Sequence, residues 1–445
     1  MADTPIHVQT LNPSSNCTSW PKQCTLRGLL THCMDIQSLP EREDLRNLSV
    51  YCNPNHPMGY NQKLKLKSLS ETKEGALYGD YIVREKRNWS DVFFDFDSVR
   101  YDETEKTEEG KQEGVNTQSS SLLLTLDRLL MLVPPIVPRH FSIASAPSMS
   151  LLQGNSCVND NDDITPNISL GNNDPTSSST TFEIELCVAL VQGKTPLGRS
   201  YQGLCSGYLS QLLSPSSLED KKVEWSNYPS LRLWIKPGSF GKLPLQSIPP
   251  SLSTAERYFE TPIMCVGAGT GIAPLRSLLL EREALRALAL NDGSALSTSS
   301  NIIINDEKGG MRNGASTSSS SPKKKDNVLV FGCRQKSADY YFQNNWEMLV
   351  HNDRLRLLTA FSRDQWHKIY VQKVLRDADG GSLLVRHLLE ENGAIYIAGG
   401  AKMAKCVKDE IIECLTEVLP RGERDAKVLL KRLGKLGKFN VEAWS

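Results

Sequence analysis

The chain has 445 residues, enough for about two or three domains and a large core. Its 51 lysines and arginines balance 51 aspartates and glutamates, which argues against binding to nucleic acid or to a membrane surface, because both need a basic excess. The eleven cysteines are scattered, odd in number and without metal-ligand spacing. They indicate reduced thiols in a cytoplasmic protein and no metal site.

Neither a signal peptide nor a membrane span is expected. The first residues, MADTPIHVQT, lack the basic flank and apolar run of a secretory signal. The most apolar run, residues 121–137, is interrupted by Asp127, Arg128 and two prolines. It is therefore too short and too charged to cross a bilayer.

Three stretches have the composition of disordered insertions: residues 102–121, 153–181 and 291–326. They are rich in polar residues and cannot bury enough apolar surface to offset the entropy lost on ordering.

Two styles of pattern alternate between these stretches. Residues 24–100 carry apolar residues at helical spacing, whereas residues 139–145 and 182–192 are predicted strands. Farther along, strands alternate with helices, which predicts a parallel sheet covered on both faces. The predicted pairs are TPIMCV with a glycine turn and a helix through Glu283, NVLVFGC with DYYFQNNWEMLV, LRLLTAFS with KIYVQKVLRD, and AIYIAGG with a helix from about Lys402 to Val418.

The sharpest motif is the glycine turn in MCVGAGTGIAPLR. Gly267, Gly269 and Gly271 follow an apolar strand, and Pro274 falls in the first turn of the next helix. Such a turn lets the backbone approach a phosphate, and the helix start offers free N–H groups. The alternative is a tight turn without a ligand. The spacing differs from GxGxxG, and no acidic residue follows at the distance expected for a ribose hydroxyl.

Basic and hydroxyl residues follow a later strand of the sheet. Ser362, Arg363, Lys368, Tyr370 and Gln372 come where open α/β sheets present ligand-binding groups. Arginine, lysine and neutral donors suit a 2′-phosphate, and Tyr370 has the ring to stack on adenine. Alone, SRDQWHK has the pattern of a solvated loop, but beside the glycine turn it indicates NADPH rather than NADH.

Two further clusters have weaker patterns. In PRHFS, alternation on a strand puts Arg139 and Phe141 on one face and His140 and Ser142 on the other; the alternative is a barrel strand with Phe141 in the core. In residues 203–213, GLCSGYLSQLL, a glycine and a serine open a short amphipathic helix. That pattern fits a pyrophosphate site and an ordinary capped helix equally well.

Taken in order, these motifs resemble the ferredoxin–NADP reductase module of the NADPH-dependent diflavin oxidoreductase family, which is similar to the cytochrome reductases. RHFS resembles the FAD motif of that family, and GLCS resembles its pyrophosphate motif. The NADPH half is matched by GAGTGIAPLR, FGCR, SR…KIYVQ and YIAGGAKMA. EAWS resembles the aromatic tail, and CTLRGLLTHCMDI resembles the helical connecting segment.

The resemblance implies a two-part fold of mixed α+β and α/β class. Residues 1–250 are expected to form an antiparallel FAD-binding β-barrel with a helical connecting segment inserted at about 21–133. Residues 256–445 are expected to form a parallel-sheet, NADPH-binding, ferredoxin reductase-like α/β domain.

The resemblance also implies residue roles. Arg139 would neutralise the flavin phosphate, Phe141 would pack on the isoalloxazine, and Ser142 would hydrogen-bond near N5. Trp444 would stack on the flavin face that the nicotinamide needs, and would swing aside for hydride transfer. The expected FAD-binding set is Lys86, Arg87, Arg139, His140, Phe141, Ser142, Gly203, Leu204, Cys205, Ser206 and Trp444. The NADPH-binding set is Thr270, Ser362, Arg363, Lys368, Ile369, Tyr370, Val371 and Gln372. The catalytic set is Ser142, Glu442 and Trp444.

The chain departs from the family pattern at several of these places. The cytochrome reductases have a cysteine where this chain has Ala398 and an aspartate where it has Gly400. Glu442 replaces an aspartate, and Cys406 stands where the family offers an aspartate to NADPH. Hydride transfer is therefore expected to be slower or differently stabilised. Lys86 and Arg87 stand where the family has paired arginines.

The implied function is hydride transfer from NADPH to FAD, with electrons passing to a flavodoxin-type FMN domain and then to cytosolic iron–sulfur cluster assembly through an anamorsin-type protein. Neither the FMN domain nor the first barrel strands are recognisable in the sequence, so we expect a truncated chain or an incomplete barrel. One alternative is a reductase for a haem or cobalamin partner. Another is a non-catalytic remnant of the fold.

Overall fold

The computed structural model describes residues 3, 5–8, 20–71, 75–100, 124–149, 184–212, 231–240, 243, 261–292 and 327–444. The chain divides into two compact units. Unit 1 draws on residues 1–140 and 189–230, and unit 2 on residues 141–188 and 231–445. The three predicted insertions lie outside the described residues, except for residues 291 and 292, which end a helix. The predicted domain boundary between residues 250 and 256 lies outside them as well.

The described residues of unit 1 are mainly helical up to residue 132, which confirms the helical pattern predicted for residues 24–100. Most of these helices are short, so they depend on packing rather than on intrinsic propensity. Their common core includes the fully buried Trp89, Leu45 and Leu66. The helices are α1 (Leu26–His32), α2 (Arg42–Leu48), η1 (Ser49–Tyr51), α3 (Gly59–Ser70), α4 (Gly75–Tyr78), η2 (Gly79–Arg84), α5 (Trp89–Asp95), η3 (Asp97–Arg100) and α6 (Leu126–Leu132).

Unit 1 also contains two antiparallel strand pairs. β1 (Pro5–His7) pairs with β2 (Gln23–Thr25), and β3 (Gln192–Lys194) pairs with β4 (Ser200–Gln202). The second pair leads through Gly203 into α8 (Leu204–Leu212). In the part of the chain that the structure describes, these pairs do not close into a barrel, so the FAD-binding barrel stays a prediction.

The core of unit 2 is a five-stranded parallel sheet, as predicted, with the strand order β7-β6-β5-β8-β9. β5, β6, β7 and β8 are strands expected from the sequence. Since β6 and β8 flank β5, the strand order reverses there, and such reversals mark the ligand crevice of open α/β sheets. The strands are β5 (Ile263–Ala268), β6 (Asn327–Cys333), β7 (Arg356–Phe361), β8 (Ala394–Gly400) and β9 (Phe439–Trp444).

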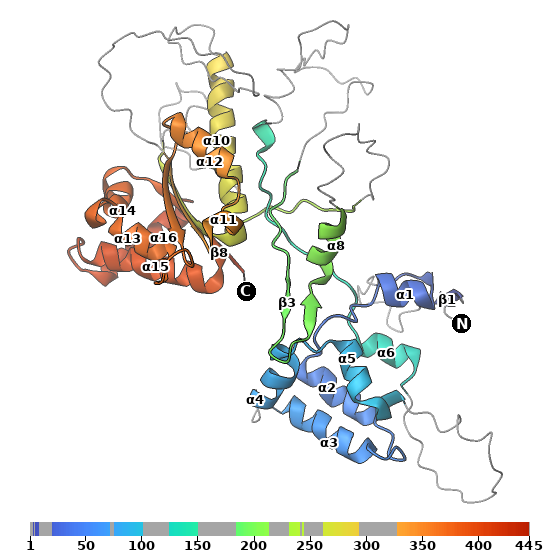
Figure 1. The fold of residues 1–445 in the computed structure, drawn as a ribbon. Helices are drawn as coiled ribbons and strands as arrows, with labels where there is room; N and C mark the ends of the chain where they lie inside the picture. Colours follow the sequence, from blue (N-terminus) through green and yellow to red (C-terminus); the bar gives the residue numbers. More distant parts are fainter. Residues whose placement is uncertain are drawn as a thin grey trace, which may run out of the picture. The chain divides into compact units, whose positions relative to one another are not determined.

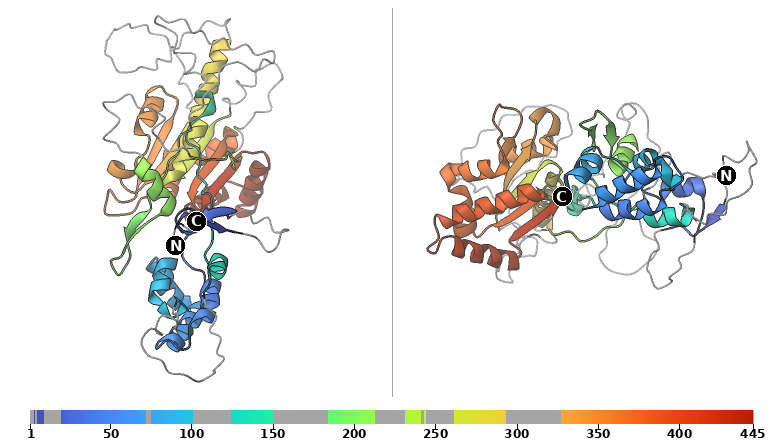
Figure 2. Two further views of the ribbon diagram at one scale, coloured as in Figure 1. Left: turned by 90° about the vertical axis from the view of Figure 1, so that its right-hand side faces the viewer. Right: turned by 90° about the horizontal axis from the view of Figure 1, so that it is seen from below.

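Helices cover both faces of this sheet (Figures 1 and 2). One face packs Val266, Val330 and Ile397 against α13, α15 and α16. The other packs Phe331 and Tyr396 against α10 and α12. The helices are η7 (Gly269–Gly271), α10 (Ile272–Asp292), α11 (Lys336–Asp339), α12 (Gln343–His351), α13 (Val371–Asp377), η8 (Ala378–Gly381), α14 (Leu383–Val385), η9 (Arg386–Glu390), α15 (Ala401–Thr416) and α16 (Glu423–Lys435).

The structure corrects several predicted elements. Of the two strands predicted over 139–145 and 182–192, residues 139–145 and 184–191 form no regular strand and share a single bridge between Ile143 and Leu186, while Gln192 begins β3. The ladder stops because the N–H of Glu185 donates to the Ser145 hydroxyl instead of to a backbone carbonyl.

Helix limits differ as well. The helix predicted over DYYFQNNWEMLV begins only at Gln343, because Phe342 adopts a left-handed conformation with φ of 60°. The helix predicted through Glu283 continues to Asp292. The sequence patterns did not predict β9 or α16.

One exposed ion-pair network yields a stability prediction. The Asp379 carboxylate accepts hydrogen bonds from Arg356 (2.7 Å) and Arg386 (2.8 Å). These bonds hold the pKa of Asp379 well below its usual range. The stabilisation is thus present above the unfolded-state pKa of about 3.9 and is lost as the pH falls below it.

We expect Asp379→Asn to lower the free energy of unfolding at neutral pH by about 1 kcal/mol. Asparagine tolerates the left-handed backbone at this position (φ 54°), so the change removes mainly the charge. The difference from the wild type, measured by urea unfolding at a series of pH values, should shrink below about pH 4. A difference that stayed constant down to acid pH would contradict this account.

Candidate functional site

The carboxyl ends of the parallel strands gather the predicted NADPH residues at one edge of the unit 2 sheet. The glycine turn follows β5, the 362–368 loop follows β7, and Gly400 ends β8. β9 pairs in parallel with β8, so Glu442 and Trp444 come to the same edge. The parallel sheet therefore brings the predicted NADPH-binding residues together with Glu442 and Trp444, although they lie far apart in the sequence.

The glycine turn packs directly on the end of β8. A methyl group on Gly271 would overlap the carbonyl group of Ala398 and would lie 2.9 Å from the Cα of Gly399. Gly269 has a φ of 57°, which favours glycine. Thr270 is partly exposed in this turn, directly before α10. The first N–H groups of a helix have no intrahelical partner, so this turn is suited to a phosphate.

The loop after β7 is joined to the end of β6. The N–H of Ser362 donates to the Cys333 carbonyl (2.9 Å), and the N–H of Arg363 donates to the Arg334 carbonyl (2.8 Å). Arg363 and Lys368 are exposed, and Tyr370 is half exposed at the N-cap of α13.

The other three residues of the predicted NADPH set are less accessible. Val371 is buried, and Ile369 packs against the same core cluster, so only their main chains remain available to a ligand. Gln372 is partly exposed in the first turn of α13.

Ser142 and Glu442 lie 300 residues apart in sequence but are hydrogen-bonded. The Ser142 hydroxyl donates to one carboxylate oxygen of Glu442 (2.5 Å), and the Ser239 hydroxyl donates to the other (2.9 Å). In the strand register Glu442 lies opposite Ala398, and Trp444 lies opposite Gly400. The glutamate and the tryptophan are therefore neighbours of Ala398 and Gly400, two of the positions where the chain departs from the family pattern.

The two aromatic side chains of the predicted flavin site keep part of their surface free. Phe141 and Trp444 are each 37% exposed. Phe141 is thus not in a hydrophobic core, which answers the alternative left open for PRHFS. Trp444 ends a hydrogen-bonded strand instead of lying in a frayed tail.

Helix α10 holds the segment that carries Ser142. Arg276 donates to the Ala144 carbonyl (2.9 Å) and pairs with Glu185. The Ser277 hydroxyl donates to the Ser145 carbonyl (2.8 Å). Ser148 binds Glu281 through its N–H (3.0 Å) and its hydroxyl (2.6 Å). The helix that begins at the glycine turn therefore also positions the segment expected to meet the flavin.

Sequence reasoning missed Arg276 and Ser239. Arg276 is buried, and a cation inside the apolar run APLRSLLL needs a partner, so that signal was present in the sequence. The sequence around Ser239 contains no pattern that predicts its contact with Glu442.

A reactive thiol is excluded at the end of β6. Burial raises the pKa of the Cys333 thiol to about 12, and the carboxylates of Asp339 and Asp364 add to the shift. The thiol is therefore protonated at neutral pH, and thiolate chemistry is not available there.

In unit 1, the start of α8 forms a second candidate phosphate site. The N–H of Val191 donates to the Ser206 hydroxyl (3.1 Å), and the N–H of Gly203 donates to the Val191 carbonyl (2.6 Å). A Cβ on Gly203 would lie 2.8 Å from the Ser206 oxygen. Leu204 and Cys205, which follow, are partly exposed in the first turn.

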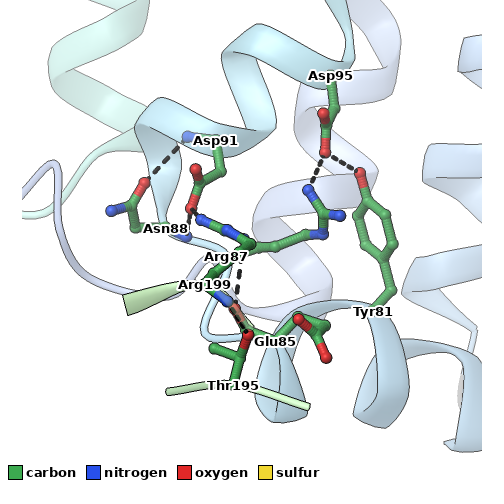
Figure 3. Close-up of polar contacts among 8 residues, drawn as sticks. All are labelled: Tyr81, Glu85, Arg87, Asn88, Asp91, Asp95, Thr195 and Arg199. Carbon is green, nitrogen blue, oxygen red and sulfur yellow. Dashed lines mark hydrogen bonds and ion pairs between the residues drawn. The ribbon is translucent and has the colours of Figure 1, made fainter. Parts of the chain in front are cut away.

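A polar cluster fixes the β3–β4 hairpin, which leads into α8, to the helical segment (Figure 3). Arg199 pairs with Asp91 and donates to the carbonyl of Glu85 (3.3 Å). In return, the Glu85 carboxylate accepts from the N–H of Leu197 (3.2 Å). Asp91 is itself fixed in the capping box of α5 with Asn88.

The remaining FAD candidates of unit 1 are partly engaged within the protein. Arg87 pairs with Asp95, and its guanidinium lies 4.5 Å from the Tyr81 ring centroid. Arg139 pairs with the buried Asp35 (3.1 Å). Lys86 and His140 are exposed.

Comparison with known protein families identifies the class of unit 2. Residues 265–409 match the family model described as an oxidoreductase NAD-binding domain. This match covers the glycine turn, the loop after β7 and β8, and it agrees with the parallel sheet. Residues 265–409 of unit 2 are thus similar to the NAD-binding domain of oxidoreductases.

Named relatives extend the similarity to nearly the whole chain. The chain is 29% identical to NADPH-dependent diflavin oxidoreductase 1 of Danio rerio, covering 98% of this chain and 54% of the relative. It is 28% identical to the Mus musculus protein of the same name, and the matched region covers 96% of this chain and 52% of that protein. It is also 26% identical to NADPH–cytochrome P450 reductase of Musca domestica, and the matched region covers 98% of this chain and 48% of that protein.

The predicted resemblance is thereby confirmed: the chain is related to the NADPH-dependent diflavin oxidoreductases and the cytochrome P450 reductases. It spans about half the length of these relatives. Of the helices that the structure describes, none is both long and apolar enough to cross a bilayer.

The packing of the glycine turn yields a second stability prediction. We expect Gly271→Ala to lower the free energy of unfolding by about 2 kcal/mol, because the methyl group forces the turn away from β8. Gly400→Ala is the matched control, since its methyl group meets open space at a φ of −61°. It should lower stability by less than about 1 kcal/mol, because its one expected effect is that alanine is a poorer N-cap for α15 than glycine. Equal melting temperatures for the two variants would contradict the packing argument.

Proposed function

We propose that the chain is the reductase module of an NADPH-dependent flavin oxidoreductase and transfers hydride from NADPH to FAD. The observation that carries this proposal is the hydrogen bond between Ser142, from the FAD motif, and Glu442, at the carboxyl edge of the NAD-binding sheet. That contact joins the flavin and nucleotide motifs within one compact unit.

The residues of unit 2 suit the two ends of NADPH. Thr270 and the first N–H groups of α10 receive the pyrophosphate. Ser362, Arg363, Lys368, Tyr370 and Gln372 hold the adenosine 2′-phosphate end, with the arginine and lysine supplying charge. Ile369 and Val371 contribute through their main chains.

Two features of unit 1 fit a bound FAD. At the start of α8, from Gly203 to Ser206, a side chain at Gly203 would meet the side chains of Ser206 and Val191, and a helix start of this kind offers N–H groups to a pyrophosphate. The exposed Lys86 and His140 lie in the motifs expected at the flavin, and Arg139 exchanges part of its contact with Asp35 for the flavin phosphate.

At the reacting end, Phe141 and Trp444 cover the two faces of the flavin ring, and Trp444 moves aside for the nicotinamide. Bound FAD supplies a ring that accepts hydride as two electrons and one proton. Glu442, held by two hydroxyl groups, carries the negative charge at this end in place of the aspartate that the family has.

Onward transfer is proposed to go through a flavodoxin-type FMN domain to an anamorsin-type protein of cytoplasmic iron–sulfur cluster assembly. The relatives named NADPH-dependent diflavin oxidoreductase 1 support a second flavin as the next carrier. The iron–sulfur step rests on the family resemblance alone. A haem partner is the second candidate, because cytochrome P450 reductases match at nearly the same identity over the same length.

The test of this function begins with flavin binding. The purified chain, as isolated or after addition of FAD, should absorb light at about 450 nm. Adding NADPH without oxygen should bleach that absorption band, because it reduces the flavin. The non-catalytic alternative predicts a colourless chain that takes up no FAD, or bound FAD that NADPH does not reduce.

The preference for NADPH over NADH gives a second prediction of the proposed function. Arg363→Ala should raise the KM for NADPH by about ten- to hundredfold, because it removes a charge-assisted contact to the 2′-phosphate. The KM for NADH, which lacks that phosphate, should change little. Arg432→Ala, at an exposed arginine on α16, controls for loss of positive charge. An equal loss with both nucleotides would show that the 2′-phosphate lies elsewhere.

A further inference from the structure

The indole of Trp366 is presented to solvent by the loop after β7. It is 95% exposed, and among the residues that the structure describes no other bulky apolar side chain is as exposed. A single exposed apolar side chain is common on protein surfaces, so its exposure alone does not indicate a ligand. The way the loop is held and the side chains around it are what point to one.

The exposure does not come from a loosely held loop. Ser362 and Arg363 are hydrogen-bonded to the end of β6, at 2.9 and 2.8 Å. The Asp364 carboxylate accepts from the N–H of Lys336 (3.0 Å). The Gln365 amide donates to the carbonyls of Phe361 and, at 2.9 Å, of His367, on either side of Trp366.

The surroundings of Trp366 indicate the kind of ligand. Arg363 and Lys368, both exposed, flank it in sequence, and its ring meets the His367 ring edge to face at 4.8 Å between centroids. Cations beside an aromatic plane suit a molecule with an anionic group next to a flat ring. The loop lies at the carboxyl edge of the sheet, where nucleotides bind.

We propose that Trp366 stacks on the adenine base of NADPH and sets the affinity for the adenosine end. This inference rests on the proposed function and deepens it, since the sequence pattern assigned the base to Tyr370. Tyr370 begins α13 just beyond the loop and is 47% exposed. Trp366 offers the larger ring and nearly all of its surface.

The test uses 2′,5′-ADP, which carries the adenine and the 2′-phosphate without the nicotinamide. Its affinity is measured by calorimetry for the wild type, Trp366→Ala, Trp366→Phe and Trp234→Ala. Trp234 is the matched control, an exposed tryptophan of the same unit (69%) outside the loop. Because Trp366 is almost fully exposed, its replacement leaves the fold intact.

We expect Trp366→Ala to weaken binding about tenfold, as loss of base stacking does. Trp366→Phe should retain most of the affinity, and Trp234→Ala should match the wild type. The loss in Trp366→Ala should be the same at low and high ionic strength, because stacking is not screened by salt.

The outcomes separate the two proposals. If the wild type binds 2′,5′-ADP and Trp366→Ala binds it equally well, the indole does not meet the base and this inference is overturned while the proposed function stands. If the wild type does not bind 2′,5′-ADP at all, the proposed function falls together with the inference.

Discussion

The close approach of Gly271 to the carbonyl of Ala398 is the constraint on which the nucleotide edge of unit 2 depends. It presses the start of α10 against the end of β8. Farther along, α10 binds residues 144–148, which extend from Ser142. Ser142 reaches Glu442 on β9, and β9 pairs with β8. The contacts thus connect the glycine turn, α10, residues 142–148, β9 and β8 in one continuous set.

Unit 1 uses a different principle, in which charged side chains fix irregular backbone. Arg199 ties the β3–β4 hairpin to α5 and to the carbonyl of Glu85, and thereby orients the start of α8. Ion pairs that are only partly exposed keep more of their strength than fully solvated ones. A hairpin of two three-residue strands is not stable by itself, so this cluster gives the candidate pyrophosphate site a defined geometry.

The sequence predicted what depends on local pattern. Strands such as β5 and β8 are continuous apolar runs, and the glycine turn carries its own signal. β9 was missed although FNVEAW begins with alternating apolar and polar residues, because the segment was interpreted only as the aromatic tail of the family. The helix break at Phe342 was missed because an aromatic residue rarely adopts a left-handed conformation. The Ser142–Glu442 bond joins residues 300 positions apart, and nothing in local periodicity encodes such a pair. Trp366 lies in a segment whose composition resembles a solvated loop, so only its exposure in the structure distinguishes it.

β9 is the outermost strand of its sheet and, within the described residues, is hydrogen-bonded only to β8. Displacing an edge strand breaks a ladder on one side only, so it costs less than opening an interior strand of the sheet. Under the proposed function, the indole that must uncover a ring in every catalytic cycle sits on this edge strand. An outward shift of β9 from β8 then exposes the ring, and the return of the strand covers it again.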